Sequence, residues 1–82
     1  MRKYKLVPDD SHKSFYGKAI VTVYDDGTEI LRSYQTDVLA KGPDGMYHRL
    51  WDDWSATTGR HIKAFSGLSK AEYLALPYEG EL

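Results

Sequence analysis

Residues 62–73, IKAFSGLSKAEY, contain the end of one predicted helix and the start of another. Gly67 follows a run of helix-compatible residues and can adopt the left-handed conformation that commonly ends a helix. Ser69 and Glu72 match a capping box, in which each side chain bonds the backbone N–H of the other residue. This segment therefore predicts two consecutive helices joined by a tight turn.

Both helices extend outward from this turn. Thr58, Ile62 and Phe65 lie on one stripe at helical spacing, which predicts a first helix from Ser55 to near Ser66. Leu68 is placed to contact Ile62 across the stop. The second helix has Leu68 and Tyr73 as a hydrophobic staple and ends before a proline, and its apolar side is expected to hold Ala71, Tyr73, Leu74 and Leu76.

The residues before the helices predict strands. Residues 18–24 are rich in β-branched side chains, and Asp26-Gly27 is a strong hairpin signal that leads into a return strand over residues 28–40. A two-residue turn would place Val23 opposite Ile30, whereas a three-residue turn with a bulge would shift this register by one. With the two-residue turn, the core face is expected to hold Ala19, Val21, Val23, Ile30, Tyr34 and Val38, and the opposite face Ile20, Leu31 and Leu39.

A second turn at residues 42–45 leads to another strand at 46–51, and residues 3–7 are a candidate edge strand. The expected fold class is α+β: a three-stranded antiparallel meander, four-stranded if residues 3–7 pair, followed by two short C-terminal helices packed on one face. One domain spans residues 1–82. Within it we expect an irregular lead-in (1–13), the meander (14–51), the helix pair (55–76) and a loose tail (77–82).

Composition limits the function classes. The chain of 82 residues has no cysteine and a net charge of −1 at pH 7, which argues against a disulfide framework, a thiolate metal site and a strongly basic DNA-wrapping protein. The first ten residues hold no apolar core of a signal peptide, and no apolar stretch approaches membrane-spanning length. We therefore expect a cytoplasmic protein without membrane association.

The strand-to-helix junction, residues 50–61 (LWDDWSATTGRH), is the most distinctive run in the sequence. A structural role accounts for much of it, because Ser55 or Thr57 can cap the helix, Asp52 and Asp53 gain from the positive helix end, and the tryptophans can fill the sheet–helix seam.

The sequence supports a catalytic or metal-binding role for the junction less well than a structural one. A metal site of His48, His61 and an Asp matches no standard zinc spacing. Hydrolysis by Ser55 or Thr57 with His61 and Asp52 lacks a nucleophile elbow. We predict no catalytic residue, no metal and no cofactor.

Nucleic-acid binding is the main alternative function. A helix start with hydroxyls followed by basic residues can hold phosphate, and the patch would comprise Arg60, His61, Lys63 and Lys70, extended by Arg32, Lys41 and Arg49. Aromatic residues supply a different option, because surface tyrosines concentrate binding energy at protein interfaces; the candidates are Tyr16, Tyr24, Tyr47 and Tyr78.

Residues 33–38 (SYQTDV), Leu50-Trp51 and residues 55–65 (SATTGRHIKAF) carry the pattern S-Y-x-T-x-V, then W, then S-x-T-T-x-x-H-x-x-x-F. This pattern resembles that of a group of small proteins from bacteriophages and plasmids of Gram-positive bacteria. The resemblance covers about residues 30–66 and carries no site residues over. It implies a mobile-element origin, and phage accessory proteins of this size are often inhibitors of host defence, anti-CRISPR proteins included.

These observations together predict a non-enzymatic phage or mobile-element accessory protein that binds a protein partner in the host cytoplasm, as an inhibitor of host defence. The expected partner-binding residues are Tyr24, Trp54, Arg60, His61 and Lys63. The alternative is a small DNA- or RNA-binding protein that uses the helix at 55–66. Self-association is a further option, since the core is thin and a sheet edge is exposed.

Overall fold

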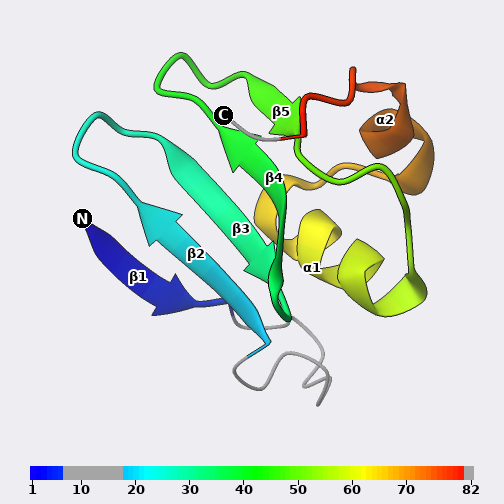
Figure 1. Ribbon diagram of the computed structural model, residues 1–82, viewed down its shortest axis with the longest axis horizontal. Coiled ribbons are helices and arrows are strands. Elements are labelled where there is room, and N and C mark those ends of the chain that lie inside the picture. Colours follow the sequence, from blue (N-terminus) through cyan, green and yellow to red (C-terminus); the bar gives the residue numbers. More distant parts are fainter. Residues whose placement is uncertain (7–17, 81–82) are drawn as a thin grey trace.

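The computed structural model describes residues 1–6 and 18–80 and consists of a five-stranded sheet followed by two helices. The fold class is α+β, as predicted, with the helices at the C-terminal side of the chain (Figure 1). The prediction of three or four strands is wrong, because the described residues contain five. In chain order the elements are β1 (Arg2–Lys5), β2 (Ala19–Val23), β3 (Glu29–Ser33), β4 (Thr36–Lys41), β5 (Tyr47–Arg49), α1 (Ala56–Ser66) and α2 (Lys70–Ala75).

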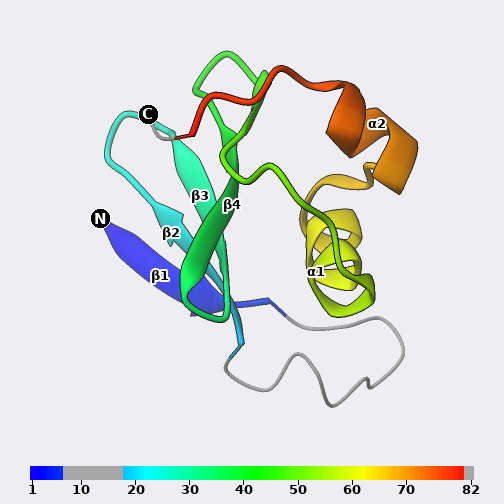
Figure 2. The ribbon, with the colours of Figure 1, turned by 45° about the vertical axis from the view of Figure 1, so that its right-hand side comes forward.

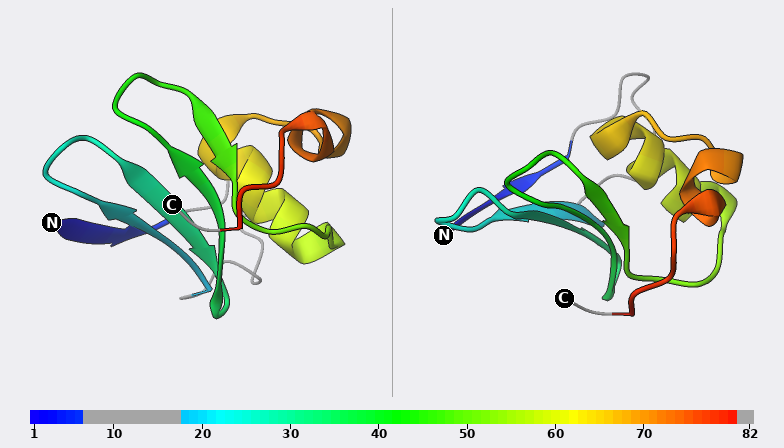
Figure 3. Two further views of the ribbon diagram at one scale, coloured as in Figure 1. Left: turned by 45° about the horizontal axis from the view of Figure 1, so that its top comes forward. Right: turned by 90° about the horizontal axis from the view of Figure 1, so that it is seen from above.

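The sheet is an antiparallel meander in which each strand pairs with its neighbours in sequence, in the order β1-β2-β3-β4-β5. The candidate edge strand is confirmed as β1, whose Arg2 lies opposite Val23 and whose Lys5 lies opposite Ile20. The helices form a second layer beside one face of the sheet, and β1 is the strand farthest from α2 (Figures 1 and 3).

The β2–β3 hairpin has the three-residue turn, so its register differs by one from that of the two-residue alternative. The Tyr24 N–H donates to the Thr28 carbonyl at 2.8 Å, and Gly27, at φ 96°, donates to the Tyr24 carbonyl at 3.0 Å. Val21 therefore lies opposite Leu31. Because a one-residue shift exchanges the two faces of a strand, Leu31 belongs to the core face and Ile30 to the opposite face, which corrects the prediction.

A second hairpin interrupts the segment that was predicted as one strand over residues 28–40. β3 ends at Ser33 and β4 begins at Thr36, so Tyr34 and Gln35 form the turn. Tyr34 has a φ of 56°, and its N–H donates to the Lys18 carbonyl at 2.7 Å. A bulky residue in this left-handed region is uncommon, and the usual turn residues are absent, so the pattern gave no signal for this turn. Tyr34 is consequently exposed and not in the core as expected.

The core lies between the sheet and the helices. Its fully buried residues come from β2, β3, β4 and both helices: Ala19, Val21, Leu31, Val38, Leu39, Ile62 and Tyr73. Trp51 and Trp54 pack against this core while remaining partly exposed, which confirms their predicted place in the sheet–helix seam. Leu39 also lies on the core face, opposite Leu31, and not on the opposite face as predicted. The prediction was wrong because the turn at Tyr34 and Gln35 and the register shift between Leu31 and Arg32 break the strand that was expected to be continuous.

Tyr73 connects α2 to the sheet. It is fully buried, and its hydroxyl donates to the carbonyl of Val38 at 2.7 Å and to that of Trp51 at 3.0 Å. Burial raises the pKa of Tyr73 to about 12, because the phenolate would lose solvation there. Ala71 and Leu74 were expected on the same apolar side but are exposed. Within α2, the Tyr73 ring is therefore the buried side chain that packs against the core.

The helix ends follow the predicted capping pattern. The Ser55 hydroxyl accepts from the Thr58 N–H at 3.1 Å, and Gly67, at φ 81°, ends α1. Ser69 and Glu72 form the complete capping box at the start of α2. These interactions satisfy the backbone N–H groups that helix starts leave without partners.

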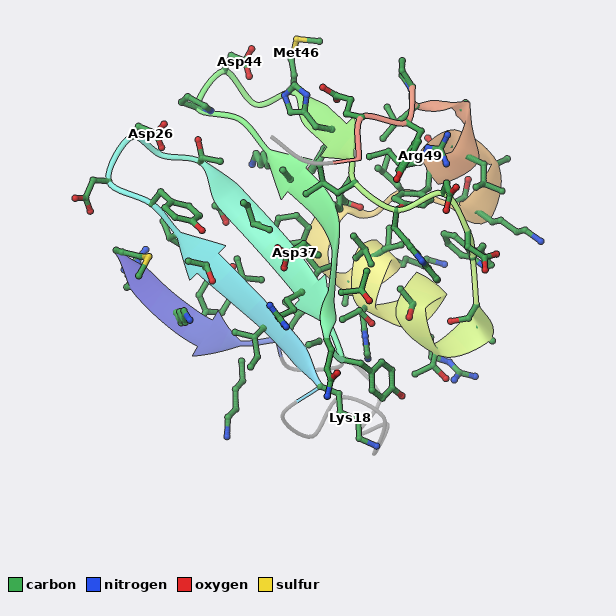
Figure 4. All side chains as sticks on the ribbon, viewed as in Figure 1. Lys18, Asp26, Asp37, Asp44, Met46 and Arg49 are labelled. Atoms are coloured by element: carbon green, nitrogen blue, oxygen red, sulfur yellow. The ribbon has the colours of Figure 1, made fainter. Side chains whose placement is uncertain are left out.

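The predicted loose tail is instead attached to β5 at residues 78 and 79. Tyr78 forms a parallel bridge with Arg49, and the Glu79 carboxylate accepts from His48 Nδ1 at 2.7 Å. Arg49, labelled in Figure 4, donates to the carbonyls of Leu76 and Trp51. Its guanidinium lies 5.8 Å from the ring centroid of Tyr73 and 5.6 Å from that of Tyr78.

Within the described residues, neither helix has the length and apolar character that a bilayer crossing requires.

Candidate functional site

A groove is lined by residues of α1, of the start of α2 and of the segments next to them. α1 and α2 follow each other in the chain and are joined by a short turn (Figure 2). The volume of this groove is about 290 Å³. We call it the α1–α2 groove, and its lining residues are Trp54, Ala56, Gly59, Arg60, Lys63, Leu68, Ser69 and Lys70. Three of the five predicted partner-binding residues, Trp54, Arg60 and Lys63, therefore line one depression.

The groove is cationic. Arg60, Lys63 and Lys70 line it, and the described residues of its lining include no carboxylate. None of the ion pairs found among residues 1–6 and 18–80 involves these three side chains. Their charges are therefore available to an anionic ligand.

The apolar part of the groove is built on a close contact between Trp54 and Gly59. A Cβ atom at position 59 would lie 2.7 Å from Cε2 of the Trp54 ring and 3.0 Å from its Cη2. The same ring packs at a tilt on Tyr73, with 5.6 Å between centroids. Gly59 thus lets the indole lie flat against α1, and Leu68 adds aliphatic surface at the other side of the groove. A glycine inside a helical pattern was the available signal for this close approach.

Three acidic residues lie close in sequence to residues that line the groove. Asp52 and Asp53 are exposed and precede Trp54, whose N–H donates to the Asp53 carboxylate at 2.7 Å. Glu72 is exposed two residues after Lys70. The cations of the groove therefore have negative charge close to them in the chain.

His61 does not belong to this surface, because it is fully buried on the side of α1 that faces the sheet. Its Nδ1 lies 2.8 Å from the Ser33 hydroxyl, which in turn lies 2.9 Å from the Thr58 hydroxyl. The prediction that His61 contacts a partner is not supported by this position. Within residues 1–6 and 18–80, the hydroxyl that meets His61 is that of Ser33, and neither Ser55 nor Thr57 has this role.

The buried Ser33–Thr58–His61 cluster was missed in the sequence. It joins β3 to α1 across 25 and 28 positions of the chain, and Tyr34 packs over His61 with 5.8 Å between ring centroids. All four residues belong to the pattern quoted above, so the pattern marks a polar contact in the core. Such contacts stabilise a specific packing when every member is hydrogen-bonded.

The remaining basic residues do not extend the groove. Arg49 is engaged by backbone carbonyls and two tyrosine rings, and Arg32 faces Asp37 at 3.9 Å. Among the described residues, no group of three or more potential metal-binding side chains comes together. His48 interacts with Glu79 instead.

Tyr24 lies on a different surface. It is exposed and lines an open depression of about 550 Å³ at the β2–β3 turn, together with Met1, Asp25, Asp26, Thr28 and Ile30. Tyr78 is exposed beside Arg49, and Tyr47 is half-buried against Phe65. Tyr16 lies outside the described residues. The predicted aromatic residues therefore do not form one patch.

Comparison with known proteins found one relationship. Searches of curated proteins and of solved structures gave no match. A family model, described as a family of unknown function (DUF8033), matches residues 4–77, which is most of the chain and includes both helices and the whole α1–α2 groove. The chain therefore belongs to the DUF8033 family.

Proposed function

We propose that this protein acts without catalysis, by binding a protein partner through the α1–α2 groove, and that the partner contributes an acidic segment with an apolar side chain. The observation that supports this proposal is the combination, in one depression, of three cations that form no ion pair with another described residue and the exposed part of the Trp54 ring. Aromatic and arginine side chains of this kind supply most of the energy at protein interfaces.

The mixed character of the groove favours a peptide. An apolar side chain of the partner would pack between Trp54 and Leu68, where contact with water is lost. Acidic side chains on either side would then meet Arg60 on one wall and Lys70 on the other. Opposite charges placed around a desolvated centre increase specificity and the association rate.

The similarity to small phage and plasmid proteins supports a biological role for such binding. A small accessory protein of a mobile element that occupies a surface of a host protein would inhibit it without any chemistry of its own. We therefore propose a host defence protein as the partner.

A selection from a random peptide library displayed on phage tests the proposal, with the folded protein as bait. We expect the enriched peptides to contain acidic residues beside a large apolar residue. The double variant Arg60→Glu/Lys63→Glu should bind them about tenfold more weakly, since each exposed charge pair is worth a fraction of a kcal/mol and reversal doubles the change. The matched control is Lys18→Glu, an exposed cation outside the groove.

Enriched peptides that bind the double variant as tightly as the unaltered protein would contradict the proposal. Thermal unfolding of each variant checks that lost binding does not reflect lost structure. Because Arg60 and Lys63 are exposed, we expect the double variant to remain folded.

The second candidate function is nucleic-acid binding by α1, which the three cations of the groove favour. Asp52, Asp53 and Glu72, which lie close in sequence to lining residues, oppose it, because an extended polyanion would pass close to them. Titration with mixed oligonucleotides at low salt distinguishes the two functions. Binding that falls steeply as salt is added would support nucleic acid as the ligand.

A further inference from the structure

The outer edge of β1 is the open edge of the sheet within residues 1–6 and 18–80. β1 is the last strand on its side of the sheet order. The opposite edge is different, because Tyr78 bridges to Arg49 of β5 and the Glu79 N–H donates to the Arg49 carbonyl at 2.8 Å. β1 therefore presents backbone N–H and C=O groups that a further strand could pair with.

This edge is strongly basic. Three of its four residues, Arg2, Lys3 and Lys5, are cationic, and every residue of β1 is exposed. No ion pair among the described residues involves these three side chains. The chain as a whole has a net charge of −1, so the positive charge here is a local property of the edge.

The charges select against one occupant and in favour of another. Two copies of β1 paired side by side would bring their cations together, and like charges on opposed strands are destabilising. A strand with glutamate or aspartate at alternate positions would instead be attracted to these cations. Lys3 and Lys5, which point to the same face because strand side chains alternate, would each meet a carboxylate.

The same face continues into a depression whose lining combines apolar side chains with those of Asp25 and Asp26. Lys3 lies opposite Thr22 and Lys5 opposite Ile20, on the face of the sheet that also carries Ile30 opposite Thr22. Met1 and Tyr24 line the depression at the end of β1 nearest the β2–β3 turn. An apolar side chain at the corresponding end of an added strand would therefore reach a surface that includes Tyr24.

We infer that the β1 edge binds an extended acidic segment of another protein by strand addition, with Lys3 and Lys5 selecting its charge. Main-chain hydrogen bonds give affinity in this mode of recognition, and alternate side chains give specificity. The site is separate from the α1–α2 groove and does not depend on the function proposed for that groove.

The test uses a short synthetic peptide that alternates glutamate and valine, titrated into the full chain and followed by amide chemical shifts. We expect the shift changes to be largest at Arg2–Lys5 and their paired residues in β2. Lys3→Glu/Lys5→Glu should weaken binding about tenfold, since it replaces two favourable charge pairs by two repulsions. Lys18→Glu/Lys41→Glu, which reverses two charges outside both β1 and the α1–α2 groove, is the matched control and should leave the affinity unchanged.

Two further peptides separate strand pairing from simple charge attraction. A version with N-methylated backbone amides retains its charge but cannot pair, and a version with lysine in place of glutamate can pair but has the wrong sign; we expect neither to bind. Equal binding of the N-methylated peptide would overturn the proposal, as would no binding of the first peptide. Shift changes confined to the α1–α2 groove would also overturn it and would favour the function proposed for that groove.

Discussion

Gly59→Ala gives a direct test of the packing between α1 and Trp54. Alanine is normally preferred to glycine inside a helix by about 1 kcal/mol, so propensity alone predicts a more stable protein. The structure predicts the opposite, because the added Cβ would overlap the Trp54 ring, lying 2.7 Å from Cε2 and 3.0 Å from Cη2.

The expected magnitude follows from what the ring must do. Moving the indole outward costs about 1–3 kcal/mol, as overpacking typically does. It also weakens the contact between the Trp54 and Tyr73 rings, and an aromatic pair of this kind contributes about 0.5–1.5 kcal/mol. Adding these two costs and subtracting the gain of about 1 kcal/mol in propensity gives a net destabilisation of about 0.5–3.5 kcal/mol. For a domain of this size that lowers Tm by about 2–28 °C.

The assay is urea and thermal unfolding followed by circular dichroism, for Gly59→Ala, Trp54→Ala and the double variant. In the Trp54→Ala background the overlap is absent, so Gly59→Ala should there increase stability by about 1 kcal/mol. This reversal of sign identifies the ring as the cause. A Gly59→Ala protein that is more stable than the unaltered chain would refute the reasoning.

Three further changes test other contacts. Ser33→Ala removes the hydroxyl that Thr58 and His61 share, and should lower the free energy of unfolding by about 1–3 kcal/mol; a loss below about 0.5 kcal/mol in urea unfolding would contradict a buried role. Because burial raises the pKa of Tyr73 to about 12 from its ordinary value of 10.0, the neutral phenol stabilises the fold below pH 10, and this contribution is lost as pH rises through 12. The free energy of unfolding should therefore be measured between about pH 9 and 12, a range that includes both pKa values. As pH rises, we expect it to fall less for Tyr73→Phe than for the unaltered chain, and equal losses would contradict the role of Tyr73. Ser69→Ala removes the cap of α2 and should lower the free energy of unfolding by about 1 kcal/mol in the same urea assay. An unchanged urea midpoint would contradict this role of the cap.

The helices were predictable because their signals are local. Ser55, Gly67 and the Ser69–Glu72 capping box act within a few residues of themselves, and each was found where the sequence placed it. The β3–β4 turn was not predictable in the same way. Tyr34 adopts a conformation that its side chain disfavours, so the turn depends on surrounding contacts and not on its own residues. The length of the predicted strand, well above the usual five or six residues, was the one available warning.

The candidate site was only partly predictable. Trp54, Arg60 and Lys63 were chosen from the sequence and do line one groove. Arg60 and Lys63 share a face of α1 because they are three positions apart, whereas Trp54 precedes α1 and reaches the groove by packing against Gly59. His61 was assigned to the same surface, although it lies one position from Arg60 and therefore points about 100° away around the helix. Its contact with Ser33 connects residues 28 positions apart, and pairing over that distance leaves no trace in local spacing.

The order of the strands has a consequence for how the chain folds. Since every strand pairs with its sequence neighbour, the β2–β3 and β3–β4 hairpins close over only a few residues and lose little chain entropy. The Tyr73 hydroxyl, in contrast, meets the Val38 carbonyl across 35 positions. Contacts between near neighbours cost less chain entropy to form than distant ones, and proteins rich in them fold faster. The central hairpins are thus suited to act as the folding nucleus, onto which the helical layer docks in a later step.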